Sequence, residues 1–278
     1  MDIPKLTTND GLILPQIGFG TYKLNGALGV NAITSALSNH YRLLDTAFNY
    51  ENEGAVGQAV KRSEVERSQI IVSSKLPGRH HHYQEALNTI QESLYRAGLD
   101  YYDLYLIHWP NPKEDLYVQA WQALITAQQM GLVRSIGVSN FLPEHIDRLI
   151  DETGVTPAVN QIELHPYFSE APLREYDQAH QIVTLAWSPL GRASSMLQDP
   201  VIQGIANDVG RSVGQVILRW ETQLGVLPIP KAAHVSRQRE NLNVFDFELS
   251  PAQMQTITNL DRPDGRLDNQ DPAEYEEF

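Results

Sequence analysis

An eightfold alternation of short apolar runs with longer amphipathic stretches is the feature that most limits how this 278-residue chain can fold. The apolar runs are rich in Val, Ile and Leu and have the length of buried strands. We predict strands at 17–19, 42–44, 70–73, 104–107, 133–138, 159–162, 183–186 and 226–229. Apolar positions spaced by three and four predict helices at 29–39, 51–61, 83–97, 116–130, 143–151, 173–180 and 215–223.

Such a βα repeat builds a parallel sheet covered by helices, either as an open doubly wound sheet or as a closed barrel. All eight runs have a similar buried character, and none has the composition of a charged edge strand. This favours an α/β fold of the (β/α)8 TIM barrel type. Ahead of the first strand, the segments 5–7 and 12–14 flank Asn9-Asp10-Gly11, which predicts a β-hairpin that closes the bottom of the barrel.

The domain organisation follows from the absence of any linker rich in Pro, Gly or Ser. We therefore expect a single domain over 1–278. Residues 261–278 hold seven acidic residues and two arginines, a net charge of −5. From about residue 261 we interpret the chain as an acidic, solvated C-terminal tail.

Composition excludes several classes of protein. A net charge of −13 and a pI near 5.1 argue against binding nucleic acid through its phosphates. No apolar run reaches the roughly 18 residues of a membrane helix, and the N-terminus lacks a targeting signal. We expect a cytoplasmic monomer with small-molecule partners. Because the chain has no cysteine, its chemistry must come from His, carboxylate, Lys, Tyr or a bound cofactor.

Three consecutive predicted strands are each followed closely by an ionisable side chain, namely Asp45, Lys75 and His108. Tyr50 lies five residues beyond Asp45. Active sites of barrels form at the carboxyl ends of the strands, so these groups should lie within reach of one another. Singly, each has a structural explanation as a helix cap, a solvated lysine, a packed histidine or a core aromatic. Their joint occurrence favours a catalytic site.

The combination suits carbonyl reduction, in which hydride reaches carbon and a proton must reach oxygen. A tyrosine hydroxyl with a pKa of about 10 is a weak acid unless a nearby cation stabilises its phenolate. The Lys75 ammonium could donate toward the Tyr50 oxygen while Asp45 holds that ammonium in position. His108 could orient the carbonyl oxygen as a neutral donor.

Three segments resemble the signatures of the aldo-keto reductase family, in particular its prokaryotic members similar to 2,5-diketo-gluconate reductases. The first is Asp45-Thr-Ala-Phe-Asn-Tyr-Glu-Asn-Glu with Gly57, and the second is Ile136-Gly-Val-Ser-Asn-Phe. The third is Ile229-Pro-Lys followed by Arg237 and Glu240-Asn. The resemblance implies a (β/α)8 barrel and NADPH-dependent reduction of aldehydes and ketones. Its implied catalytic tetrad is Asp45, Tyr50, Lys75 and His108.

The same resemblance implies a cofactor site that runs from the nicotinamide to the adenine. Trp187 would stack on the nicotinamide ring, and Lys231 with Arg237 would meet the 2′-phosphate. Ala232 departs from the serine common at this position in the family, so NADH is a weaker alternative cofactor. The full implied set is Thr21, Ser139, Asn140, Gln161, Trp187, Ser188, Leu190, Lys231, Arg237, Glu240 and Asn241.

By position, the substrate pocket should be lined by Tyr22, Asn49, Pro77 and Trp109. These residues give an aromatic wall with one amide group. The segments after Pro110 and Leu190 carry no large insertion. The pocket therefore favours small aldehydes, α-dicarbonyls or keto sugars over long steroids.

Three competing readings stay open at the level of sequence. A Rossmann dehydrogenase would need a third glycine where Lys23 stands. A metal-dependent barrel hydrolase is suggested by His80, His81 and His82, which we interpret instead as an exposed loop without a metal. A barrel that binds nucleotide as a sensor or regulatory subunit is disfavoured by the complete tetrad.

Overall fold

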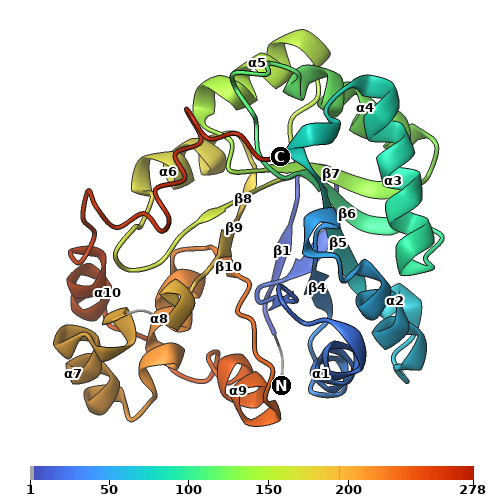
Figure 1. The fold of residues 1–278 in the computed structure, drawn as a ribbon. Coiled ribbons are helices and arrows are strands. Elements are labelled where there is room, and N and C mark those ends of the chain that lie inside the picture. The colour runs from blue at the N-terminus through green and yellow to red at the C-terminus, as the bar shows by residue number, and fades with distance from the viewer. Residues whose placement is uncertain (1–2, 194) are drawn as a thin grey trace.

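The computed structural model describes residues 3–193 and 195–278, and it confirms the predicted (β/α)8 architecture (Figure 1). Eight strands pair in parallel in chain order. They are β3 Phe19–Gly20, β4 Leu43–Asp45, β5 Ile71–Leu76, β6 Tyr102–Ile107, β7 Val133–Ser139, β8 Val159–Glu163, β9 Val183–Trp187 and β10 Leu227–Pro228. Backbone hydrogen bonds from Gly18 N to Pro228 O (2.9 Å) and from Gly20 N to Pro230 O (3.1 Å) join the first strand to the last. These bonds close the barrel.

Helices surround this barrel, and every predicted helix has a counterpart in the structure. They are α1 Gly26–Ser38, α2 Glu53–Arg62, α3 Tyr83–Ala97, α4 Tyr117–Gln129, α5 Pro143–Thr153, α6 Ala171–Ala179, α7 Pro200–Val209, α8 Val213–Gln223, α9 Val235–Leu242 and α10 Pro251–Thr258. Helices α7 and α10 go beyond the simple repeat of one helix after each strand, whereas α9 is the helix that follows the last strand. The helical pattern of all three was not predicted. Two of them have clear start signals, since Asp199 and Ser250 each accept a backbone N–H as N-cap and each is followed by Pro.

The interior of the barrel is filled by aliphatic side chains from alternate strands. Leu43, Leu104, Leu106 and Val159 belong to this cluster, and Leu14 joins it from outside the barrel. The packing leaves little room at the seam between the first and last strands. A Cβ on Gly18 would come within 2.9 Å of Leu43 Cδ2 on β4 and within 3.3 Å of Ile229 Cγ1 just after β10, so glycine lets the seam close.

The predicted hairpin is confirmed and covers the amino-terminal end of the strands. Strands β1 Lys5–Thr7 and β2 Ile13–Pro15 pair antiparallel. Asn9 Nδ2 donates to Pro157 O (2.9 Å), and Ser135 Oγ donates to Asp10 Oδ2 (2.7 Å). Because Pro157 precedes β8 and Ser135 lies near the start of β7, the hairpin closes the bottom of the barrel and leaves the opposite end open.

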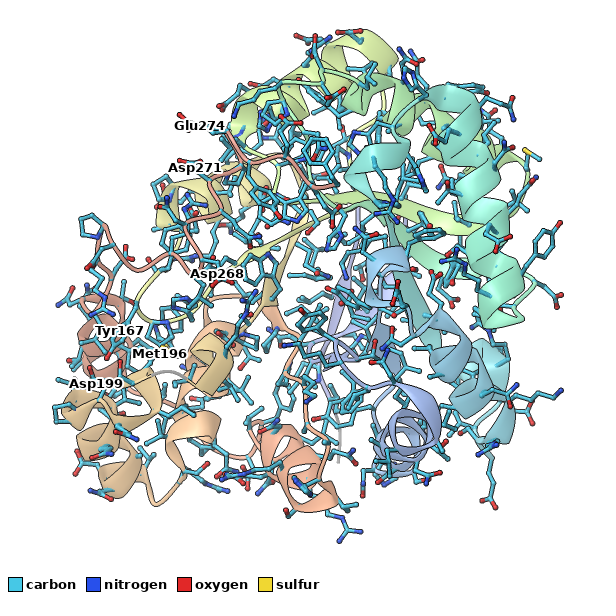
Figure 2. The ribbon with its side chains drawn as sticks, viewed as in Figure 1. Tyr167, Met196, Asp199, Asp268, Asp271 and Glu274 are labelled. Carbon is cyan, nitrogen blue, oxygen red and sulfur yellow. The ribbon has the colours of Figure 1, made fainter. Side chains whose placement is uncertain are left out.

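The C-terminal segment is not the fully solvated tail that its charge predicted. In Figure 1 it runs from α10 past α6 toward the middle of the molecule, and Figure 2 labels Asp268, Asp271 and Glu274 along it. Those three acids are exposed, as expected, but Glu277 is only 8% exposed. A high net charge predicts a solvated segment only if the rest of the protein offers no cation or N–H donor to its carboxylates. Here several such groups bind them, for example Gly78 N and Arg192. Among the described residues, no helix has the length and apolar character that crossing a bilayer requires.

One buried acid in the helical layer gives a prediction about stability. Asp177 on α6 is fully buried and accepts hydrogen bonds from Thr184 Oγ1 (2.8 Å) and Asn160 Nδ2 (3.4 Å). Burial raises the pKa of its carboxyl, and the two hydrogen bonds lower it. Because the effect of burial is larger, the pKa is about 7. The protonated form therefore stabilises the fold fully below about pH 4, and that contribution is lost as the pH rises through about 7.

We expect Asp177→Asn to stabilise the protein at about pH 8 and to change little at about pH 4, since the amide mimics the neutral acid. A shift of this size corresponds to roughly 2–4 kcal/mol. Thermal unfolding at both pH values measures it, with the exposed Asp151→Asn on α5 as the matched control. An equal pH dependence in the variant and the wild type would refute this account of Asp177.

Candidate active site

A buried ion pair lies at the carboxyl ends of β4 and β5. Lys75 is fully buried, and its Nζ lies 2.7 Å from Asp45 Oδ2 and 2.8 Å from Thr46 O. Gln161 Nε2 donates to the other carboxylate oxygen of Asp45 at 2.9 Å. Burial lowers the pKa of Lys75, and the charge and hydrogen bond of Asp45 oppose that shift. The carboxylate thus helps to keep a charged ammonium where a lone lysine would lose its proton.

Tyr50 lies beside this pair, at the end of the 3-10 turn η1 Phe48–Tyr50. Its ring centroid is 5.1 Å from Lys75 Nζ and 5.8 Å from the ring of His108, in an edge-on arrangement. Burial raises the pKa of Tyr50 well above its usual value, and the charges of Asp45 and Glu277 add to this effect. The hydroxyl therefore keeps its proton, which a proton donor requires.

The sequence predicted a hydrogen bond from the Lys75 ammonium to the Tyr50 hydroxyl, and within the described residues no such hydrogen bond is formed. The two hydrogen bonds of the Lys75 ammonium go to Asp45 and Thr46. Since an ammonium carries three N–H donors, one remains for an oxygen that approaches from the Tyr50 side. The structure therefore brings the four predicted catalytic residues together, with Asp45, Tyr50 and His108 facing a common pocket and Lys75 directly behind it.

The pocket has a volume of about 730 Å³ and opens at the carboxyl ends of the strands. Of the residues predicted to line the substrate pocket, Tyr22, Asn49 and Trp109 do so, and Pro77 does not. Pro77 is buried and begins the turn η3 Gly78–His80 behind the pocket wall. The predicted cofactor residues that line the pocket are Thr21, Asn140, Gln161, Trp187, Ser188, Leu190 and Lys231.

A hydrogen-bonded chain fixes the wall where Trp187 lies. Asn140 follows β7 with φ of 62°, a left-handed conformation that asparagine tolerates better than most residues. Its Oδ1 accepts from Trp187 Nε1 (2.7 Å), and its Nδ2 donates to His108 O (2.9 Å). Ser139 is buried outside the lining, and its hydroxyl donates to Gln161 O (2.8 Å). The indole ring is thereby held as a half-exposed wall of the pocket.

The cationic end of the predicted cofactor site lies beyond the pocket. Lys231 is exposed at its rim, whereas Arg237, Glu240 and Asn241 lie on α9 outside the lining. Arg237 is exposed and pairs with both carboxylate oxygens of Glu240, at 3.0 and 2.7 Å. The N-cap residue of α9, His234, makes no side-chain capping bond, so the first N–H groups of this helix stay open to an anion.

The site contains a carboxylate that the sequence analysis missed. Glu277 Oε1 lies 2.7 Å from His108 Nδ1 and accepts from Asn49 Nδ2 (2.8 Å), and Glu277 Oε2 accepts from Gly78 N (2.9 Å). Burial alone would raise the pKa of this carboxyl, but the charge and contact of His108, with the donors from Gly78 and Asn49, lower it to about 2. Glu277 is therefore an anion inside the pocket.

Other residues of the C-terminal segment also reach the site. Tyr275 packs on Trp109 with ring centroids 4.5 Å apart, and Gln270 lines the pocket. Arg192 pairs with Asp268 and lies 5.7 Å from the centroid of the Trp187 ring. The one sequence signal of this contact is the aromatic Tyr275 inside an acidic tail, because the other aromatic of the tail, Phe278, is exposed.

The three adjacent histidines do not form the exposed loop that was predicted. His81 is 1% exposed, while His80 is half-buried with Nδ1 2.9 Å from Thr89 Oγ1, and His82 is exposed. Because the three side chains differ in exposure, they do not share one surface. Within residues 3–193 and 195–278, no group of three or more His, Asp or Glu is arranged to hold a metal ion.

Comparison with known proteins gives a match over most of the chain. The model of the aldo/keto reductase family matches residues 16–262. A 2,5-diketo-D-gluconic acid reductase B of Corynebacterium sp. (strain SHS752001) is 51% identical over 277 residues, which is 100% of this chain and 99% of that protein. A methylglyoxal reductase DkgA of Yersinia pestis is 42% identical and covers 93% of each chain.

The fold is also similar to solved structures. A crystal structure of a mutant of Gox0644 in complex with NADPH has a TM-score of 0.93 and 39% sequence identity to this chain. The alignment covers 98% of both chains. The similarity therefore extends over the barrel and most of the C-terminal segment.

Proposed function

This chain belongs to the aldo/keto reductase family, and we propose that it reduces the carbonyl group of a small substrate to an alcohol with NADPH, using Tyr50 as the proton donor. Membership of the family makes the protein an oxidoreductase. The observation that carries the proposal is the buried Asp45–Lys75 pair beside Tyr50 and His108 at a pocket of about 730 Å³.

Tyr50 is suited to deliver the proton because its phenol is protonated and faces the pocket. When the substrate oxygen gains negative charge, the proton moves from the phenol to that oxygen. The Lys75 ammonium, 5.1 Å from the ring centroid, then stabilises the phenolate that is left. Asp45 has an indirect role, since it holds Lys75 charged and in place. General acid catalysis of this kind is worth about 10² to 10⁴ in rate.

The residues around Trp187 fit a dinucleotide. The half-exposed indole of Trp187, held by Asn140, offers a flat apolar face on which a nicotinamide ring could stack. The amides of Asn140 and Gln161 line the same pocket and could form hydrogen bonds with the carboxamide of that ring. Ser139, Ser188, Leu190 and Thr21 would complete that end of the site. Bound NADPH supplies the hydride for the carbonyl carbon.

The opposite end of the dinucleotide site has the charge for a phosphate. Lys231 and Arg237 would bind the 2′-phosphate, helped by the uncapped N-terminus of α9, and Glu240 and Asn241 would lie toward the adenine. Ala232 is 5% exposed and offers no hydroxyl there. We therefore propose that NADPH is preferred and that NADH serves as a weaker alternative.

The substrate class follows from the lining and from the relatives. Tyr22, Trp109 and Tyr275 form an aromatic wall with the Asn49 amide, and the C-terminal segment limits the length of the pocket. The named relatives act on 2,5-diketo-D-gluconic acid and methylglyoxal. We propose α-dicarbonyls, keto sugars and small aldehydes as substrates for a monomeric, cytoplasmic enzyme that needs neither nucleic acid nor a membrane.

Steady-state oxidation of the reduced cofactor tests this proposal. Methylglyoxal, an aromatic aldehyde and a keto sugar are each assayed with NADPH and with NADH. We expect turnover of at least one carbonyl and a higher kcat/KM with NADPH. Binding of NADPH without turnover of any carbonyl would support the sensor alternative, and an advantage for NADH would overturn the cofactor assignment.

A further inference from the structure

Two carboxylates line the described part of the pocket, Asp45 and Glu277, and they differ in their partners. The ammonium of Lys75 lies 2.7 Å from Asp45 Oδ2, so these two charges offset each other. Glu277 forms no ion pair with any lysine or arginine of the described residues. Its one such contact is with the His108 ring, which is charged only when it is protonated. Glu277 is thus the carboxylate of the pocket that lacks a permanent cation beside it.

The hydrogen bonds of Glu277 indicate that its side chain is ionised. Gly78 N donates to Oε2 at 2.9 Å, and Asn49 Nδ2 donates to Oε1 at 2.8 Å. Asn49 presents its amide nitrogen to Glu277, while its Oδ1 accepts from Arg79 Nη1 at 2.6 Å. Both carboxyl oxygens are therefore acceptors, which is the role of an ionised carboxylate. The pKa of this carboxyl, about 2, agrees with that form.

The position of Glu277 is fixed by the fold from several directions. Asn111 Nδ2 donates to Glu277 O (2.9 Å), and Glu277 N donates to Asn111 Oδ1 (3.0 Å), so the backbone of the tail is anchored. Gly78 leaves room for this approach, because a Cβ there would lie 2.5 Å from Glu277 O. With its side chain also held, the carboxylate acts as a fixed charge.

This anion lies in the part of the pocket where a substrate carbonyl would react. Its Oε1 is beside the His108 ring, and the centroid of that ring is 5.8 Å from the centroid of the Tyr50 ring. In the proposed reduction the carbonyl oxygen lies between Tyr50 and His108. A group on the carbonyl carbon then occupies the pocket that Glu277, Trp109 and Tyr275 line. A negative charge on that group would face the fixed negative charge of Glu277.

We propose that Glu277 determines substrate specificity, by making the enzyme discriminate against compounds that carry a carboxylate next to the reacting carbonyl group. This proposal rests on the proposed reduction and narrows its substrate class. Aldehydes and α-dicarbonyls without such a carboxylate are accepted, whereas 2-oxo acids are disfavoured. The repulsion is effective because Glu277 is only 8% exposed, and like charges interact more strongly where water is partly excluded.

The cations near the pocket do not cancel this charge. Lys23 and Lys231 line the pocket but are exposed, and Lys231 is assigned to the cofactor phosphate in the proposed function. Arg192 is also exposed and pairs with Asp268. Arg79 is exposed and lies outside the lining. Water and salt screen exposed charges, so the buried carboxylate has the stronger effect on a bound substrate.

Phenylglyoxylate and its primary amide test the proposal, because they have nearly the same size and differ in charge. Their kcat/KM values are measured with NADPH for the wild type and for Glu277→Gln, at about pH 8, above the usual range of imidazole titration. The intrinsic reactivities of the two carbonyls differ, but this difference is the same for both proteins. We expect the acid-to-amide ratio of kcat/KM to rise about tenfold in Glu277→Gln.

A ratio that stays within about twofold of the wild-type value would overturn the proposal. This includes an equal loss of activity toward both substrates, which would mean that Glu277 only holds the tail in place. Glu277→Asp supplies the rescue, because it keeps the charge on a shorter side chain. We expect its ratio to stay near the wild-type value even if its kcat falls.

Glu276→Gln is the matched control, because it removes the same charge one residue away and outside the lining. Glu276 Oε1 accepts from Lys113 N (2.6 Å), which an amide oxygen can also do. We expect its acid-to-amide ratio to equal that of the wild type. A rise as large as in Glu277→Gln would assign the effect to the net charge of the protein and would overturn the role of Glu277.

Binding of the two alcohol products, mandelate and mandelamide, gives a readout that needs no turnover. Calorimetry measures their affinities for the complex of the enzyme with the oxidised cofactor. We expect mandelamide to bind more tightly to the wild type, and the preference to shrink about tenfold in Glu277→Gln. Equal affinities in the wild type, or no binding of either compound, would overturn the proposal even if the variant failed to fold. A wild type that reduces no carbonyl counts against the proposed function, while these affinities still decide the charge preference.

Discussion

Tyr50→Phe is expected to lower kcat for carbonyl reduction by about 10² to 10⁴ while the affinity for NADPH stays within about twofold. The substitution removes one oxygen from a ring packed against Tyr22 and His108, so the pocket keeps its shape. The loss should appear in kcat, because the proton is needed in the transition state and contributes little to binding. Stopped-flow mixing of the NADPH complex with methylglyoxal measures the chemical step, and quenching of intrinsic fluorescence measures cofactor binding.

The control for this variant is Tyr95→Phe on α3, which makes the same chemical change on an exposed ring far from the pocket. Its kcat should equal that of the wild type. If Tyr50→Phe retained the wild-type rate of the chemical step, the proton would have to come from another group at the pocket, such as His108 or Tyr22.

Lys75→Met is expected to suppress turnover by about 10² or more and also to destabilise the fold. The loss of activity follows because the phenolate of Tyr50 would lose its neighbouring cation. The loss of stability follows because Asp45, 4% exposed, would remain as a buried charge without its partner. Removing one member of a buried pair costs about 3–5 kcal/mol. Thermal unfolding and steady-state kinetics measure the two effects.

The double variant Asp45→Asn with Lys75→Met separates these effects. It removes both charges, so most of the lost stability should return, while kcat should remain at the level of the single lysine variant. Recovery of activity together with stability would mean that Lys75 supports the fold and has no part in catalysis.

The barrel could be predicted from the sequence because each of its strands is buried on both sides. Such strands appear as mainly apolar runs, for example β6, whose six residues are all buried, and polar residues directly after them must lie at one end of the barrel. The sequence alone therefore predicts that Asp45, Lys75 and His108 lie together. The same reasoning could not predict the additional helices. The repeat predicts one helix after each strand, whereas α7 and α8 both follow β9.

The C-terminal segment could not be predicted, for a physical reason. Its binding depends on single contacts with groups distant in the chain, such as Gly78 N, Asn111 and Leu267 N with Glu163 (2.7 Å), and not on a periodic apolar face. Charge and composition are properties of the segment alone, and they suggested a solvated tail. The consequence for the site is large, because Glu277 adds a fixed anion beside His108.

The most direct test of the central claim follows the hydrogen that is transferred. The enzyme is mixed with methylglyoxal and with NADPH that carries deuterium on the reactive face of its nicotinamide, and the alcohol product is analysed by mass spectrometry. The account predicts one deuterium bound to the carbon of the new hydroxyl group, with the hydroxyl proton coming from Tyr50 and exchanging with water. A product without deuterium on that carbon, or the absence of any alcohol with either face labelled, would contradict it.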